Sequence, residues 1–213
     1  MKLFLTTFFL MTACTAAKED TATETQESDT DTDTDTDTDT DTDTDTDTDT
    51  DTDSQSDGVS LVVDATSRTD WVYLALDGFE VVSPVDPAES TEWDLAFKRY
   101  EVMVNGGVSG TGGVEGVALV GQYNNYDSYD TAAATGWVSD AADSNGDGVP
   151  EFVFGGWYDY DFMTHALSPA DMLYFVRAVD GTHYRLRFLD YYSNDGTSGV
   201  ITLEYGEVLG PLE

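Results

Sequence analysis

The feature that most constrains the fold of this chain is a strict alternation of aspartate and threonine from Asp29 to Asp53. The repeat contains no apolar residue, so it cannot bury apolar surface to offset the conformational entropy lost on folding. Like charges at every second position also repel one another, which favours an extended chain. We therefore expect residues 15–57 to form a disordered acidic tether, and the folded domain to be confined to residues 58–213.

The charge balance excludes one large class of partners. The chain has 213 residues, with 8 Lys and Arg against 43 Asp and Glu, for a formal net charge of −35. Because affinity for nucleic acid depends on cationic groups that displace counterions from phosphates, we expect no nucleic-acid partner. The same charge disfavours direct binding to an anionic membrane surface. Residues 58–213 carry six basic and 25 acidic residues, but they also hold all four tryptophans and all twelve tyrosines, enough to build a core.

The N-terminus has the form of a secretory signal, because Lys2 precedes an apolar run that is followed by small residues. The segment Met11-Thr12-Ala13-Cys14 resembles a bacterial lipobox, in which the cysteine is lipidated. Cys14 is the only thiol of the chain, which also excludes an intrachain disulfide. We predict that residues 1–14 are a lipoprotein signal peptide with a lipidated Cys14, exported by a Sec-type route, and that this lipid anchor is the only contact with the membrane. Thr15 in place of aspartate resembles the sorting signal that enteric bacteria use for the outer membrane, which leads us to expect location at the outer membrane or cell surface. The alternative is an ordinary secretory signal with an incidental cysteine.

The rest of the chain has the period-two alternation of apolar and polar residues that is typical of β-strands. The clearest segments are residues 71–76, 93–98, 183–188 and 201–205. Turn signals rich in glycine, asparagine and aspartate separate them. These signals are Asp77-Gly78, Asn105-Gly106-Gly107, Asp180-Gly181 and Ser193-Asn194-Asp195-Gly196.

No segment has a sustained apolar period of 3.6 residues, so long helices are not expected. Short helical turns are predicted at Tyr126–Ala134 and at Ser168–Asp171. The predicted fold class is all-β: an antiparallel β-sandwich or an open barrel, with short helical turns in its loops.

Three blocks, Trp71–Leu74, Trp93–Tyr100 and Asn105–Gly110, resemble in that order the signature blocks of the HmuY-type haem-binding lipoproteins. The segment from Tyr174 to Tyr205 is similar to the closing strands of that family. The resemblance implies an all-β secreted lipoprotein that holds haem between loops at one end, with two axial ligands that are His or Met. Considered as residues alone, the blocks are core-facing strands and a glycine turn.

Haem iron accepts an imidazole, thioether, thiolate or phenolate as an axial ligand. His165 lies in a loop before the Tyr174 strand, where the family tends to place one ligand, and we predict it as a ligand. His183 shares a strand face with arginines and is expected to face solvent or a neighbouring strand. No His or Met occurs between Gly107 and Gly156, where the resemblance leads us to expect the other ligand. The candidates for that position are Met163, Met172, Tyr123, Tyr126 and Tyr129.

The two propionates of haem would also need cations close by, because residues 58–213 carry a net charge of −19. The candidates are Lys98, Arg99, Arg177, Arg185 and Arg187.

A second candidate site lies in the loop from Asp143 to Glu151. Asp143, Asn145, Asp147 and Glu151 offer oxygen ligands of the kind that Ca²⁺ takes in a tight loop, and Gly146 permits the turn. The pattern resembles the loops of dockerin and thrombospondin type 3 repeats. It does not match a complete EF-hand, because Glu151 follows Asp147 by only four residues. The loop is therefore either a calcium site or an acidic surface turn.

The sequence contains no nucleophile elbow, zinc-protease motif, phosphate-binding loop or dinucleotide fingerprint, so we expect no enzymatic activity. The leading hypothesis is a surface-tethered, haemophore-like lipoprotein of HmuY type, whose partners are haem or another small ligand and an outer-membrane receptor. The alternative is a calcium-stabilised β-sandwich that has lost haem binding and serves adhesion or carbohydrate binding.

Overall fold

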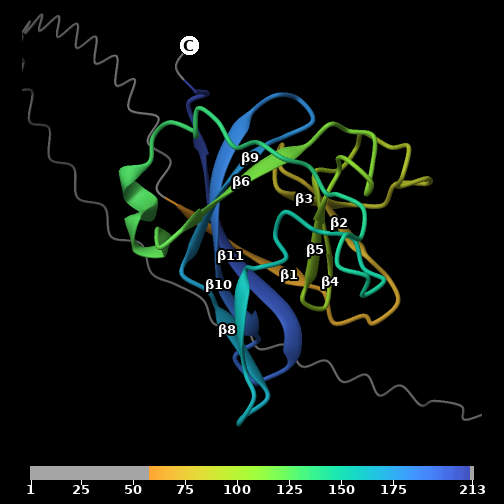
Figure 1. The fold of residues 1–213 in the computed structure, drawn as a ribbon, viewed down its shortest axis with the longest axis vertical. Helices are drawn as coiled ribbons and strands as arrows, with labels where there is room; N and C mark the ends of the chain where they lie inside the picture. Colours follow the sequence, from red (N-terminus) through yellow and green to blue (C-terminus); the bar gives the residue numbers. More distant parts are fainter. Residues whose placement is uncertain (1–57, 212–213) are drawn as a thin grey trace, which may run out of the picture. The chain divides into compact units, whose positions relative to one another are not determined.

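The computed structural model describes residues 58–211, which lie in the second of the two units into which the chain divides. These residues form eleven strands and one 3₁₀ helix, η1 (Figure 1), which confirms the prediction of an all-β domain. The signal peptide and tether predicted for residues 1–57 lie outside the described residues. The strands are β1 (Val59–Asp64), β2 (Val72–Ala75), β3 (Glu80–Val82), β4 (Leu95–Lys98), β5 (Glu101–Val104), β6 (Glu115–Val120), β7 (Tyr158–Asp161), β8 (Ala166–Pro169), β9 (Met172–Arg177), β10 (His183–Tyr192) and β11 (Ser198–Val208), and η1 spans Tyr123–Ser128.

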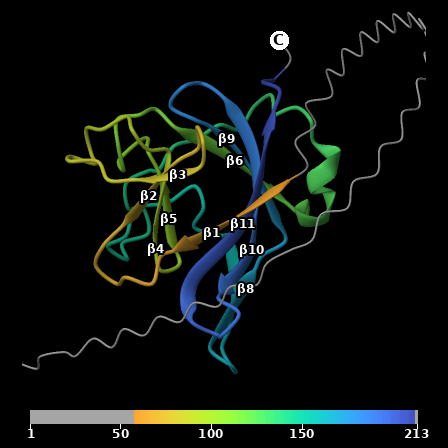
Figure 2. The same cartoon turned by 180° about the vertical axis from the view of Figure 1, so that it is seen from behind.

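The strands are arranged in two main sheets and one hairpin. A five-stranded antiparallel sheet has the order β1-β11-β10-β9-β6, and a four-stranded antiparallel sheet has the order β3-β2-β4-β5. Strands β7 and β8 pair only with each other. Figures 1 and 2 show the two main sheets side by side and the β7–β8 hairpin projecting from one end. None of the sheets formed by residues 58–211 closes on itself, so of the two predicted architectures, a sandwich and an open barrel, the structure has the sandwich.

The main core lies between the two sheets. The five-stranded sheet contributes the face that carries Tyr184, Leu186 and Phe188, which are buried as their alternation predicts. The four-stranded sheet contributes Leu95 and Phe97, which have no exposed surface. Because successive side chains of a strand point to opposite faces, one apolar face of each sheet is enough to form this core.

The other face of the five-stranded sheet is also covered, by the segment of residues 123–137. Val117 and Phe175 pack there against Ala132 in a second, smaller cluster. The helical turn predicted at Tyr126–Ala134 is confirmed only for residues 126–128, the end of η1, and is wrong for the alanine run, which is not helical. This cover explains why Arg185, predicted to lie on an outward face, is only 4% exposed.

The helical turn predicted at Ser168–Asp171 is wrong. Residues up to Pro169 belong to strand β8, and Tyr158 of β7 pairs with Pro169. The Ala170 N–H then donates to the Trp157 carbonyl at 2.9 Å, which keeps the chain extended. A proline is acceptable here because β8 is a strand of a two-stranded hairpin, where a missing N–H need not break a ladder.

Three buried polar side chains connect loops to strands. The Asp94 carboxylate accepts hydrogen bonds from the N–H groups of Leu76 and Val179, both at 2.7 Å. Leu76 follows a strand of the small sheet and Val179 follows a strand of the large one, so Asp94 ties the two sheets together. Burial raises the pKa of the Asp94 carboxyl, and the two hydrogen bonds oppose that rise. Asn105 donates to the carbonyls of Ser90 and Trp93 at 2.8 and 2.7 Å.

Asp140 makes a similar connection at the edge of the small sheet. Its carboxylate accepts from the N–H groups of Val104 at 2.9 Å and Val153 at 2.8 Å. Gly107, at φ +65°, approaches Asp140 so closely that a Cβ would overlap the Asp140 carbonyl oxygen. The glycine turn predicted after Asn105 is therefore confirmed, with steric crowding as a second reason for glycine.

We predict that Asp94→Asn lowers the free energy of unfolding by about 2 kcal/mol, because the new amide can accept at only one oxygen and leaves one buried N–H unpaired. Urea denaturation measures the change. Asp86→Asn, at an exposed aspartate, is the matched control and should change stability by less than about 0.5 kcal/mol. Equal stability of the two variants would contradict the role assigned to Asp94.

Candidate functional site

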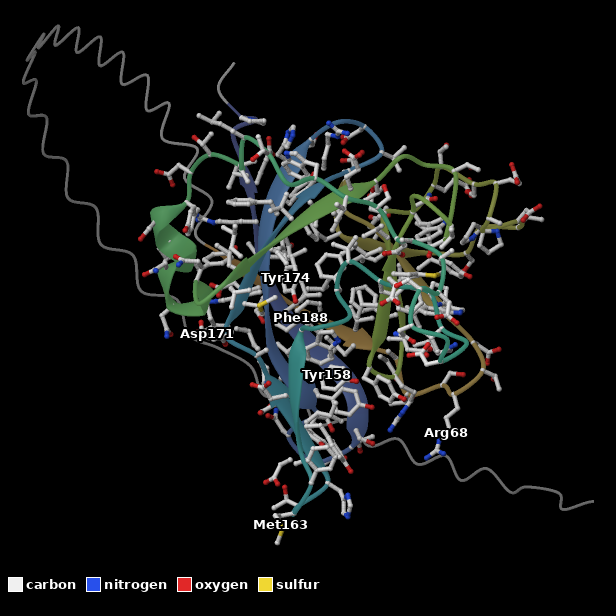
Figure 3. All side chains as sticks on the ribbon, in the orientation of Figure 1. Arg68, Tyr158, Met163, Asp171, Tyr174 and Phe188 are labelled. Carbon is white, nitrogen blue, oxygen red and sulfur yellow. The ribbon has the colours of Figure 1, made fainter. Side chains whose placement is uncertain are left out.

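A pocket of about 490 Å³ is lined in part by residues of the β7–β8 hairpin, which projects from one end of the domain (Figure 1). Its walls come from the β4–β5 turn, from the hairpin, and from the junction of β10 with β11. Figure 3 places Arg68 and Met163 at this end, with Arg68 towards the four-stranded sheet and Met163 at the hairpin tip. This volume is in the range typical of small-ligand sites.

Cations are concentrated in this pocket. Arg68, Lys98 and Arg99 line it, and they are half of the six Lys and Arg residues in 58–213. Its lining includes a single carboxylate, that of Glu101. In a domain that carries 25 acidic residues, this gathering of cations makes the pocket suited to a negatively charged ligand.

The pocket also has aromatic and apolar walls. Tyr191 is buried, Tyr192 is half-buried and Tyr100 is more exposed. Leu167 adds an apolar surface, and its N–H donates to the Tyr192 hydroxyl at 3.0 Å, which fixes the hairpin against β10. Burial raises the pKa of Tyr191, so its phenol stays protonated at neutral pH. These walls fit a flat apolar body better than a small polar one.

His165 completes the lining from the hairpin side. Its imidazole Nδ1 lies 2.5 Å from the Tyr160 hydroxyl, and the backbone N–H of His165 donates to the Asp161 carbonyl at 2.8 Å. One ring nitrogen thus has a partner within the hairpin, which orients the ring and leaves Nε2 for a ligand.

Backbone strain is concentrated here as well. Among residues 58–211, three non-glycine residues have positive φ, and two of them, Arg99 (+55°) and His165 (+58°), line this pocket. A left-handed backbone costs an L-residue about 1–2 kcal/mol and is characteristic of functional positions.

The fold and the pocket agree with comparisons to known proteins. The family model HmuY protein matches residues 67–205. The chain belongs to the HmuY family. The match spans the β4–β5 turn and the hairpin, so both walls of the pocket lie within the HmuY region. The resemblance predicted from the sequence blocks is confirmed.

Solved structures share the HmuY fold at low sequence identity. The apo HmuY analogue of Tannerella forsythia is 16% identical, with a TM-score of 0.54, covering 71% of this chain and 95% of that one. Apo PinO from Porphyromonas gingivitis is 15% identical, with a TM-score of 0.52 and coverage of 71% and 97%. A candidate lipoprotein of Bacteroides fragilis is 23% identical, with a TM-score of 0.50 and coverage of 70% and 89%. Among curated proteins, none matches.

The structure separates the ligand candidates predicted from the sequence. Met163 lies at the hairpin tip, two residues from His165, and is 89% exposed. Met172 is half-buried and packs against the main core. Tyr126 is fully buried beside Arg185, on the far face of the five-stranded sheet. Of these four candidates, His165 alone lines the cationic pocket of this HmuY-family domain.

His183 and three of the predicted cations also lie away from the pocket. His183 is half-buried against the Trp137 ring, and the centres of the two rings lie 5.4 Å apart. Burial lowers the pKa of its imidazole, and the charge of Arg177 adds to this effect. Arg177, Arg185 and Arg187 pair with Glu115, Asp130 and Glu204. Lys98 and Arg99 are therefore the two predicted cations that the structure brings to the pocket.

The loop predicted as a calcium site is organised by its own hydrogen bonds. Asp143 accepts from the N–H groups of Gly146 at 2.6 Å and Gly148 at 2.8 Å, which lower the pKa of its carboxyl. Glu151 accepts from the Ser144 hydroxyl at 2.9 Å. Within residues 58–211, no three His, Cys, Asp or Glu side chains gather closely enough to hold a metal ion. The calcium site at Asp143, Asn145, Asp147 and Glu151 thus gains no support from the structure and stays a prediction. Measuring the melting temperature at increasing concentrations of free calcium would test it.

Residues that the sequence did not single out complete the pocket. Arg68, Tyr100, Tyr191 and Tyr192 come from three separate segments that only the fold brings together. Two sequence features could have indicated this pocket: the adjacent tyrosines Tyr191-Tyr192, and the adjacent cations Lys98-Arg99, which are unusual in so acidic a chain. Within the described part of the chain, no helix has the length and apolar character needed to cross a bilayer.

We predict that His165→Gly is more stable than His165→Ala by about 1 kcal/mol, because glycine adopts the left-handed backbone of this position without strain. The two variants lose the same imidazole, so their difference isolates the backbone. Urea denaturation of both variants measures it. A less stable glycine variant would show that the hairpin does not hold this backbone.

Proposed function

We propose that this HmuY-family protein is a non-catalytic haem-binding lipoprotein, and that the pocket beside the β7–β8 hairpin is its haem site. One observation carries the proposal: three of six cations, buried and half-buried tyrosines, and a well-oriented imidazole line the same cavity. These are the groups that propionates, a porphyrin face and haem iron require, respectively.

The residues present fit haem with one axial donor from the pocket itself. His165 would hold the iron through its free ring nitrogen, while Leu167 and the tyrosines would pack on the macrocycle. Bound haem would supply the Soret band that reports its coordination. Tyr191 is suited to packing rather than to ligation, because its raised pKa keeps the hydroxyl protonated. Among the lining residues there is no Met, Cys or second His.

We predict that His165→Ala weakens ferric haem binding at least about tenfold and shifts the Soret band, because the axial nitrogen is lost. Titration of haem into wild type and variant, followed by absorption, measures both effects. His183→Ala is the control, since His183 lies against Trp137 and outside the pocket. Identical affinities and spectra for wild type and His165→Ala would overturn the assignment.

We also propose that the domain is displayed at the outer membrane or cell surface through lipid on Cys14, with residues 15–57 as the spacer. The sequence pattern before Cys14 and the absence of apolar residues in the Asp-Thr repeat support this proposal. Carrying haem from this position would require a receptor that accepts it, and an outer-membrane receptor is the partner that we propose.

We predict that the full chain enters the detergent phase in a temperature-induced phase partition, whereas Cys14→Ser stays in the aqueous phase or is released to the medium. The physical reason is that an acyl chain contributes about 0.8 kcal/mol for each buried methylene. Thr15→Ser, which keeps the cysteine, is the control. Recovery of the full chain in the aqueous phase would exclude the anchor.

A further inference from the structure

The three cations of the pocket differ in what already holds them. The Arg99 guanidinium donates to the Ser198 carbonyl at 2.6 Å and to the Ser198 hydroxyl at 2.7 Å. It also reaches the Thr66 carbonyl at 3.4 Å. These bonds tie the β4–β5 turn to the start of β11, so Arg99 acts mainly as part of the wall.

Lys98 and Arg68 are different. The Lys98 ammonium lies 2.8 Å from a Glu101 carboxylate oxygen and 4.4 Å from the centre of the Trp71 ring. Both side chains of this pair are about one quarter exposed, at 25% and 24%, so an incoming ligand can reach them. Arg68 is exposed and forms no ion pair with any residue of 58–211. A ligand that enters the pocket can therefore bind Arg68 directly, whereas it has to displace the Glu101 carboxylate before it can bind Lys98.

Glu101 occupies a boundary between two cavities of opposite charge. It lines the cationic pocket and also an adjoining cavity of about 520 Å³, which carries Asp147 and Glu151. Leaving Lys98 would bring the Glu101 carboxylate towards two like charges, which is unfavourable. The Lys98–Glu101 pair thus resists weak anions and yields only to a ligand that binds strongly elsewhere.

We propose that the pocket selects ligands that carry two carboxylates, with Arg68 taking one and Lys98 the other, and that Glu101 sets specificity by competing with the ligand for Lys98. This inference rests on the proposed function, because it names the groups of a porphyrin, its two carboxylates, that the same pocket recognises. The charge of the lining agrees: three cations and one carboxylate leave two positive charges, which match two carboxylates. A ligand with one carboxylate, or with both esterified, cannot displace Glu101 and satisfy Arg68 together.

The test compares ferric haem with its dimethyl ester, both presented in the same detergent micelles to the folded protein. Wild type should bind haem at least about tenfold more tightly than the ester, because charged hydrogen bonds to the propionates are lost on esterification. Arg68→Gln should weaken haem binding by about tenfold and leave the ester unchanged.

Glu101→Gln should change the affinity for haem in the direction opposite to Arg68→Gln, which a merely structural role of Glu101 would not produce. It should tighten haem binding by about threefold, because Lys98 is then free, and should not tighten ester binding. Glu115→Gln and Arg177→Gln are matched controls, since they break an ion pair outside the pocket. Both should leave haem binding unchanged. Far-ultraviolet circular dichroism verifies that each variant is folded.

The outcomes are distinguishable. Equal binding of haem and its dimethyl ester by wild type would overturn the two-carboxylate inference while leaving haem binding in place. Weaker haem binding by Glu101→Gln would overturn the role of Glu101 as a competitor. Failure of wild type to bind either porphyrin would overturn the proposed function, and the inference with it.

Discussion

The structure depends on the buried Asp94 carboxylate, which accepts one N–H from Leu76, directly after β2 of the four-stranded sheet, and one from Val179, just after β9 of the five-stranded sheet. The sandwich core is apolar and could tolerate small shifts of one sheet against the other, since hydrophobic burial is not directional. Two charge-assisted hydrogen bonds of 2.7 Å are directional, and they fix where β2 and β9 end relative to each other. Those ends position the rest of the four-stranded sheet, including Lys98 at the end of β4 and Arg99 in the β4–β5 turn.

The six cations of residues 58–213 fall into two groups of three. Three arginines lie on the far face of the five-stranded sheet, and each has a carboxylate partner there. Arg185 and Arg187 also stack on the Tyr126 ring, at 4.5 and 4.8 Å, so they hold η1 and the segment after it against the sheet. The three remaining cations of the domain line the pocket, with Glu101 as their single acidic companion. One half of the positive charge therefore serves the fold, and the other half creates a cationic cavity on a strongly acidic protein.

The sequence was sufficient for the strands and for the family, because period-two alternation and short ordered blocks are local signals. It failed at Ser168–Asp171, where pairing with β7 overrode a local helical signal. The sequence also did not predict that the outer face of β10 is covered, because no local pattern indicates that residues 123–137 fold back over Arg185. Of the residues that line the pocket, His165, Lys98 and Arg99 could be predicted from the sequence. Arg68 was not predictable in this way, because it reaches the other lining residues only through the pairing of β1 with β11, which joins segments more than a hundred residues apart.

The placement of strain indicates why the pocket is built from a turn and a hairpin tip. Arg99 holds its left-handed backbone because its N–H donates to the Ala65 carbonyl at 2.9 Å and its guanidinium is fixed at Ser198. Among residues 58–211, His165 takes its hydrogen bonds from its own hairpin, through the Asp161 carbonyl and the Tyr160 hydroxyl. The cationic wall is therefore anchored to both sheets, whereas the imidazole is carried by two strands that pair with nothing else. The Leu167 N–H, which donates to the Tyr192 hydroxyl at 3.0 Å, holds this hairpin against β10. The two walls of the pocket are therefore held by different parts of the fold: the cationic wall is held by both main sheets, and the imidazole wall by a hairpin that is docked on β10.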